Sequence, residues 1–119
     1  MIIEDVSLRK ITAVLENNEI QKIKDFMQGA VYCWCKNCKD DDLHPKWFAA
    51  HDLFGGDNYF WEGTPLFKLY EWHERNGSAD PIKMAGRDAG HLLKEILYND
   101  RRNFHTREGF TREYQWAGE

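Results

Sequence analysis

Residues 85–116, AGRDAGHLLKEILYNDRRNFHTREGFTREYQW, decide the fold that this sequence predicts. The first half of the stretch carries six apolar residues at the spacing of one buried helical face: Ala85, Ala89, Leu92, Leu93, Ile96 and Leu97. Asn99 and Asp100 follow, and both residue types favour turns over helix interiors. The pattern therefore predicts an amphipathic helix over residues 83–98.

Two short runs after this helix predict a β-hairpin. Residues 101–106 and 110–116 flank Arg107-Glu108-Gly109, and Gly109 can adopt the positive φ of a tight hairpin turn. Residues alternate between the two faces of a strand. One face of the second run is therefore expected to carry Phe110, Arg112, Tyr114 and Trp116, and the other Thr111, Glu113 and Gln115.

The outer side of the predicted helix carries a cationic and aromatic stripe, formed by Arg87, His91, Lys94 and Tyr98. Asp88 and Glu95 are expected to flank this stripe and partly cancel its charge. Three arginines add positive charge around the hairpin: Arg101, Arg102 and Arg107. A helix and hairpin charged in this way are typical of proteins that read nucleic acid. The alternative is an ordinary α+β element whose polar residues only keep the chain soluble.

The first part of the chain is expected to be helical scaffold, within residues 1–38. Ser7 can cap a short helix that places Leu8, Ile11, Val14 and Leu15 on one face. A second helix is expected from about Glu19, with an apolar stripe of Ile20, Ile23, Met27, Ala30, Val31 and Trp34. Residues 36–44 are polar and predict a loop.

A winged-helix-like part is expected over residues 45–119. Pro45 introduces WFAAHDLF, a short strand or helical turn that ends at Gly55-Gly56. Thr64-Pro65 is a helix start, and Asn76-Gly77 ends that helix. Its buried face is expected to hold Leu66, Leu69, Tyr70 and His73. The predicted fold is thus a single α+β domain, mostly helical with a C-terminal β-hairpin, and its last helix would lie in a DNA major groove.

Residues 65–116 resemble the small winged-helix domain at the C-terminus of phage and plasmid primase-helicases. The matching segments are PLFKLYEWHERNG, AGRDAGHLLKEIL and an arginine-bearing hairpin that ends in YQW-x-G. The resemblance implies a DNA-binding accessory domain, with Arg87, His91 and Lys94 facing the groove. It also implies that Arg101, Arg102 and Arg107 lie near phosphates. The ATPase and primase domains of that family have no counterpart in this sequence.

Composition limits the class of protein. The chain has 119 residues, is 42% hydrophobic and carries a net charge of −4, which suits one domain with its own core. No apolar run approaches the ~18 residues of a membrane span. The start, MIIEDVSLRK, lacks the layout of a signal peptide, so a cytoplasmic protein with reduced cysteines is expected.

Charge is unevenly distributed along the chain. Residues 1–82 hold nine Lys and Arg against fourteen Asp and Glu, a net charge of −5. Residues 83–119 hold seven against six, a net charge of +1. A local cationic face on an acidic body is expected to bind DNA modestly and with strong dependence on salt.

Three cysteines lie in YCWCKNCKDDDLH, residues 32–44. Cys35 and Cys38 have zinc-knuckle spacing, and His44 with Cys33 or His51 could complete four ligands. A second CxxC pair and the glycine of a knuckle turn are absent. The preferred interpretation is that Cys33, Cys35 and Cys38 are buried free thiols at a helix end, and no cofactor is predicted.

No set of residues predicts a reaction. Asp40-Asp41-Asp42 is interpreted as a solvated acidic loop, and His73 as a core histidine bonded to a backbone carbonyl. Gly55-Gly56 lacks the Lys-Ser/Thr of a phosphate loop. A non-enzymatic DNA-binding protein is therefore expected, of the accessory or regulatory kind that phages and plasmids carry.

The alternative is a protein-interaction factor, for instance a phage-encoded inhibitor or adaptor. Its acidic loop and exposed aromatic residues would contact a basic host protein. A run of aromatic residues is expected to lie mainly in the core, with a protein-docking patch or a stacking platform for single-stranded bases as alternatives. These aromatic residues are Trp47, Phe48, Tyr59, Phe60 and Trp61.

Overall fold

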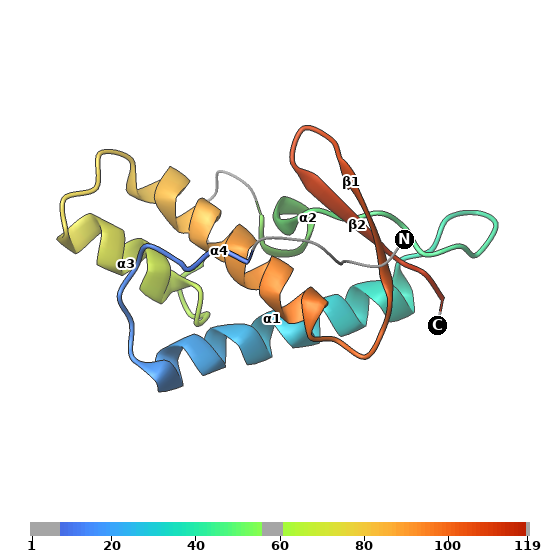
Figure 1. Ribbon diagram of the computed structural model, residues 1–119, viewed down its shortest axis with the longest axis horizontal. Helices are drawn as coiled ribbons and strands as arrows, with labels where there is room; N and C mark the ends of the chain where they lie inside the picture. Colours follow the sequence, from blue (N-terminus) through green and yellow to red (C-terminus); the bar gives the residue numbers. More distant parts are fainter. Residues whose placement is uncertain (1–7, 56–60, 119) are drawn as a thin grey trace.

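Four helices and one antiparallel hairpin make up the computed structural model, which describes residues 8–55 and 61–118 (Figure 1). The helices are α1 (Asn17–Asn37), α2 (Ala50–Phe54), α3 (Phe67–Arg75) and α4 (Pro81–Tyr98). The strands are β1 (Phe104–Glu108) and β2 (Arg112–Trp116). The fold is α+β and mostly helical with a C-terminal hairpin, as the sequence predicts. Within the described residues, no helix has both the length and the apolar character needed to cross a bilayer.

Helix α4 lies at the centre of the molecule, against α3 and across α1 (Figure 1). All six apolar residues predicted for its inner face are buried: Ala85, Ala89, Leu92, Leu93, Ile96 and Leu97. Each large side chain buried in this way stabilises the fold by roughly 1.5–3 kcal/mol. Asp80 caps the helix, because its side chain accepts a hydrogen bond from the Lys83 backbone N–H at 3.1 Å.

Helix α1 begins with two bonds between Glu16 and Glu19. The Glu16 backbone carbonyl accepts from the Glu19 N–H at 3.0 Å, and the Glu19 side chain accepts from the Glu16 backbone N–H at 3.2 Å. The helix then buries one residue per turn: Ile23, Met27, Val31 and Cys35. The predicted stripe is therefore confirmed at its centre, while Ile20, Ala30 and Trp34 are only partly buried.

The first predicted helix is wrong in the described part, because residues 8–16 contain no helix. The backbone N–H groups of Thr12 and Ala13 donate to the Asp88 carboxylate at 2.8 and 3.0 Å. In a helix they would bond carbonyls four residues earlier. A tertiary contact has thus replaced the local one. The expected cap, Ser7, lies outside the described residues.

Helix α3 begins later than predicted. The Thr64 hydroxyl donates to the Trp61 carbonyl at 2.8 Å instead of capping the helix, which starts at Phe67. The predicted end is confirmed, since Gly77 adopts a φ of +72° directly after the Asn76 cap. Leu66, Leu69 and His73 are buried as expected.

The hairpin is shorter than predicted, with Phe104 opposite Trp116 and Glu108 opposite Arg112. Gly109 is not among the glycines with positive φ, so the predicted turn geometry is wrong there. Phe48 pairs with Tyr114 through two backbone hydrogen bonds of 2.8 Å, which fixes the segment before α2 against β2. Of the aromatic residues noted in the sequence, Phe48 and Trp61 are buried, whereas Tyr59 and Phe60 lie outside the described residues.

Candidate nucleic-acid interface

The outer face of α4 carries the stripe that the sequence predicted. Arg87 and Tyr98 are exposed, and His91 and Lys94 are half-buried. Lys83 is also exposed, in the first turn of the same helix. Arg87, Tyr98 and Lys83 are therefore presented to solvent, whereas His91 and Lys94 are only partly so.

The two acidic residues that were expected to cancel the charge of this stripe interact with other parts of the protein. Asp88 is fully buried, so the prediction that it flanks the stripe is wrong. Glu95 forms an ion pair with Lys24 of α1. The positive charge of the stripe is consequently less cancelled by its own helix than the sequence suggested.

Asp88 is buried because it completes a hydrogen-bond network. Its Oδ1 accepts from the Thr12 N–H, and its Oδ2 accepts from the Ala13 N–H and lies 2.8 Å from His73 Nε2. Since a carboxylate only accepts, Nε2 of the histidine carries the proton. On the other side of the ring, His73 Nδ1 lies 2.8 Å from the Ser78 hydroxyl oxygen. His73 was expected to bond a backbone carbonyl, and that detail is wrong.

Ser78, His73 and Asp88 have the residue types of a hydrolytic triad, but the arrangement is a structural one. His73 and Asp88 have no exposed surface. Both oxygens of the carboxylate are already engaged by backbone N–H groups. A catalytic triad needs room for a substrate beside the nucleophile and its base. This network instead ties residues 12–13 to α3 and α4.

Arg9 lies just before Thr12 and Ala13, which bond Asp88 of α4, and its charge acts on His91 of the stripe. Burial lowers the pKa of the His91 imidazole below its usual 6.5, and Arg9, Arg87 and Lys94 act in the same direction against the opposing charge of Asp88. The charges of three cations therefore act on one imidazole. We call Arg9, Arg87, His91 and Lys94 the α4 basic cluster. Arg9 could not be assigned to it from the sequence, because only the fold brings residues 9 and 91 together.

Two of the three arginines near the hairpin are held by carboxylates of the same chain. Arg102 donates from Nε and Nη2 to Asp100 at 3.0 and 2.8 Å. Arg107 donates to Glu113 at 2.6 Å, and its guanidinium lies 3.9 Å from the centroid of the Trp47 ring. Arg101 is exposed. The hairpin therefore presents less net positive charge than its arginine content suggests.

The residues considered for zinc do not form a cluster in the described part of the chain. The prediction that these cysteines are buried is confirmed for Cys35 and wrong for Cys33, which is exposed; Cys38 is half-buried. His44 lies instead beside Asp40 and Asp42, with one possible ligand atom of each within 4.8 Å of the others. The Asp40 carboxylate accepts the backbone N–H groups of His44 and Asp42, which lowers the pKa of Asp40. This acidic loop is a turn that its first aspartate stabilises.

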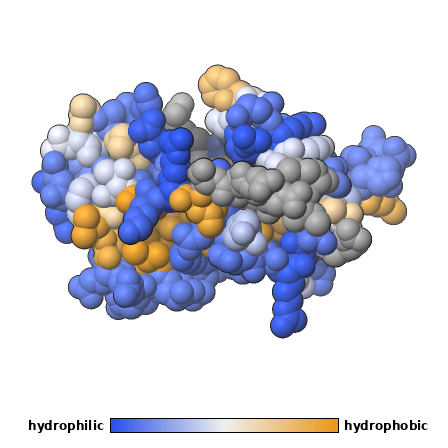
Figure 2. Space-filling view, viewed as in Figure 1, coloured by the Kyte–Doolittle hydropathy of each residue, from blue (hydrophilic) through white to orange (hydrophobic). Residues whose placement is uncertain are grey.

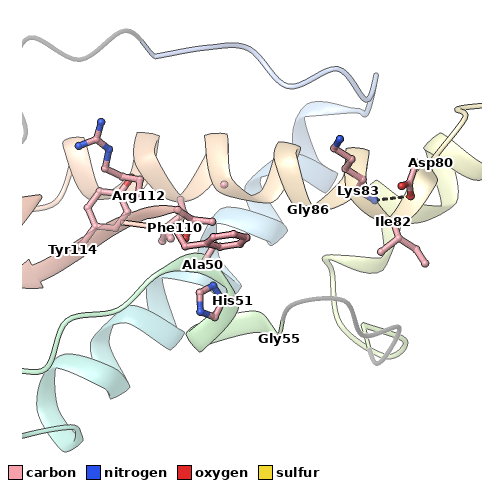
Figure 3. A pocket seen from close by; sticks show the side chains of 13 residues that line it. Ala50, His51, Gly55, Asp80, Ile82, Lys83, Gly86, Phe110, Arg112 and Tyr114 are labelled. Carbon is pink, nitrogen blue, oxygen red and sulfur yellow. Dashed lines mark hydrogen bonds between the residues drawn. The ribbon is translucent and has the colours of Figure 1, made fainter. Parts of the chain in front are cut away.

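A groove of about 830 Å³ lies between α2, the N-terminal half of α4 and the hairpin tip (Figure 3). Gly86 and Gly90 form part of its α4 wall, and Lys83 and Arg112 lie along it. Phe110 at the hairpin tip also lines the groove and is fully exposed. Apolar surface stands out above the hairpin tip in Figure 2.

Comparison with known proteins gives no match to a family model, to a curated protein or to a solved structure. Function is therefore inferred from the geometry.

Proposed function

We propose that this protein binds nucleic acid, with duplex DNA as the expected ligand, through the α4 basic cluster. The observation that carries the proposal is the removal of both local carboxylates from the stripe. Asp88 is buried in a hydrogen-bond network, and Glu95 is paired with Lys24. Arg9 adds a cation that the helix alone does not supply.

In this proposal three cations of the cluster contact phosphates: Arg9, Arg87 and Lys94. Each phosphate contact releases counterions from the duplex, so three contacts give a slope of roughly −3 in log affinity against log salt. Because phosphate contacts carry no direct sequence information, affinity of the non-specific kind is expected, with a Kd of about 1–100 μM.

The test is fluorescence anisotropy of a labelled duplex at two salt concentrations. Arg87→Ala with Lys94→Ala is expected to weaken binding about tenfold and to flatten the salt dependence. The control is Lys22→Ala with Arg75→Ala, two exposed cations on α1 and α3 that remove the same charge elsewhere. Equal weakening by the two double variants, or no duplex binding below about 100 μM, refutes the proposal.

His91 supplies a second readout. Burial lowers the pKa of His91 below its usual 6.5, which favours the neutral ring in the free protein. A phosphate bound beside these cations would raise that pKa, and by linkage the affinity should rise as the pH falls below 7. His91→Gln should remove this rise and keep the affinity at pH 8. A pKa of His91 that does not change on adding duplex contradicts the proposal.

A protein partner is the second candidate, favoured by the fully exposed Phe110 ring beside the groove. Aromatic side chains of this kind dominate binding energy at protein interfaces. The expected outcome is a defined basic partner that co-purifies after nuclease treatment and is lost with Phe110→Ser. A partner retained by Phe110→Ser excludes this surface.

A further inference from the structure

A second pocket, of about 490 Å³, lies between the C-terminal part of α1 and the end of β2. These two parts of the chain lie side by side in Figure 1, although they are far apart in the sequence. We call it the α1–β2 pocket, and its lining consists of Tyr32, Cys35, Lys36, Lys39, Arg102 and Trp116. It is separate from the α4 basic cluster, with which it shares no residue.

The described residues that line this pocket are cationic. They include three basic residues and no acidic one, in a chain that holds 20 Asp and Glu against 16 Lys and Arg. The hollow between α1 and α3 contrasts with it, since Glu16, Glu19 and Glu71 line that hollow beside its lysines. The groove at α4 also includes an acid, Asp80. The α1–β2 pocket therefore has the charge that an anion requires.

The nearest ion pair does not remove this charge. Asp100 binds Arg102 through Nε and Nη2 and also accepts from the Gln28 side chain at 2.6 Å. Its carboxylate is 5% exposed and does not line the pocket. Arg102 itself lines the pocket, and its side chain is 20% exposed while Asp100 holds the guanidinium in place. An arginine fixed in this way is well suited to hold a phosphate oxygen.

Two aromatic rings complete the walls. The Lys36 ammonium lies 5.8 Å from the centroid of the Tyr32 ring, and the Lys39 ammonium lies 5.4 Å from that of Trp116. Each cation is thus held next to a flat apolar surface. Tyr32 is 54% exposed, so its ring is not part of the core. Neighbouring rings and cations form the combination that binds a base and its phosphate together.

We propose that the α1–β2 pocket binds a nucleotide, with the base against Tyr32 and Trp116 and the phosphate among Lys36, Lys39 and Arg102. The volume lies within the ~300–1,000 Å³ of small-molecule sites. The nucleotide can be a free monophosphate or the 5′-phosphorylated end of a single strand, because both present one ring and one terminal phosphate.

The probes are AMP, adenosine, inorganic phosphate and a 5′-phosphorylated single-stranded tetranucleotide, titrated calorimetrically into the full chain. AMP should bind with a Kd on the order of 100 μM. Adenosine and phosphate should each bind at least about tenfold more weakly, since each meets half of the site. A phosphate affinity equal to that of AMP, or no saturation by about 10 mM AMP, overturns the proposal.

Variants locate the site. Lys36→Ala with Lys39→Ala should weaken AMP binding about tenfold, and Tyr32→Ala should weaken it several-fold. Lys22→Ala with Arg75→Ala is the control of equal charge and should leave AMP binding unchanged. Lys36 and Tyr32 are exposed, so their single variants report on binding even if Lys39→Ala disturbs the end of α1. Equal effects of the pocket and control variants place AMP elsewhere and overturn the proposal.

The affinity for the single-stranded tetranucleotide distinguishes the two sources of the nucleotide. Tighter binding of the tetranucleotide than of AMP assigns the pocket to a strand end, and equal or weaker binding assigns it to a free nucleotide. Either result agrees with the proposal. AMP binding should also survive Arg87→Ala with Lys94→Ala, so a failure at the α4 basic cluster does not decide the outcome here.

Discussion

Asp88 satisfies three donors with one carboxylate. The Thr12 and Ala13 N–H groups and the His73 ring meet at its two oxygens, and neither Asp88 nor His73 has exposed surface. Buried donors that lose their acceptor keep the full desolvation cost, whereas the intact network offsets it. The stability of the N-terminal segment therefore depends strongly on this single residue.

Asp88→Ala is expected to destabilise the protein by roughly 2–4 kcal/mol in a urea titration, because it leaves buried donors without an acceptor. The N-terminal segment should also open, so that trypsin cleaves after Arg9 and Lys10 faster than at sites within the helices. Asp25→Ala is the matched control, since Asp25 is exposed on α1 and bonds only Gln21 among the described residues. Equal losses in the two variants would show that the network does not stabilise the fold.

The three cysteines differ in burial along a single turn of helix and its end. Burial raises the pKa of the Cys35 thiol, while Cys33 is exposed. The thiolate is the reactive form, so Cys33 should react with Ellman's reagent at least about tenfold faster than Cys35. Cys33→Ser should remove the fast phase, and urea should bring Cys35 to the rate of a free thiol. A fast phase that persists in Cys33→Ser contradicts this assignment.

At the scale of elements, the spacing of apolar residues predicted which side of a helix is buried. It did not predict where hydrogen bonds to distant residues replace a helix. The apolar face of α4 was predicted completely, because six side chains repeat at helical spacing. Residues 8–16 also have a helical apolar pattern, yet they are not helical. The backbone N–H groups of Thr12 and Ala13 instead donate to the carboxylate of Asp88, 76 and 75 residues away. A local sequence pattern cannot predict such a distant partner.

Helix α4 contains two glycines that its own packing does not require. A Cβ added to Gly86 or Gly90 would meet nothing within 4 Å, and neither residue has a positive φ. Each glycine costs a helix interior about 0.8–1 kcal/mol relative to alanine. Gly86→Ala and Gly90→Ala should therefore each stabilise the protein by roughly 0.5–1 kcal/mol and raise the Tm.

Gly77→Ala provides the opposite control for this prediction. Gly77 has a φ of +72°, where an alanine side chain is strained even though the space around it is open. The substitution should lower the stability by about 1 kcal/mol. Lower stability of both α4 variants would mean that these glycines serve the fold after all.

At the scale of the whole molecule, the positions of charges were predicted less well than the positions of apolar residues. The stripe of Arg87, His91 and Lys94 was correctly placed on the outer face of α4. The ion pairs of Arg102 with Asp100 and of Arg107 with Glu113 were not predicted. The effect of the Arg9 charge on His91 was not predicted either. Burial follows from the sequence of one helix, whereas ion pairing depends on which segments the fold brings together.

Asp100 connects the end of α4 with α1 and with the segment ahead of β1. Its titration should therefore change the free energy of unfolding of the protein. It accepts from Gln28 of α1 and from the Arg102 side chain and backbone N–H ahead of β1. Burial of the carboxyl acts to raise its pKa, but the hydrogen bonds from Arg102 and Gln28 outweigh burial and hold the pKa below its usual 3.8. The ionised form is therefore favoured by folding, and its contribution is fully present above about pH 4.

Asp100→Asn should lower the free energy of unfolding by about 2 kcal/mol at pH 7, because the amide loses the charge-assisted bonds to Arg102. The difference from the natural chain should shrink below about pH 3.8, and it should disappear as the pH falls through the lowered pKa of the folded state. Urea titrations between pH 7 and pH 2 measure it, with Asp25→Asn as an exposed control that has little effect throughout. If the difference in unfolding free energy between the two proteins stays constant down to pH 2, the charge of Asp100 does not stabilise the fold.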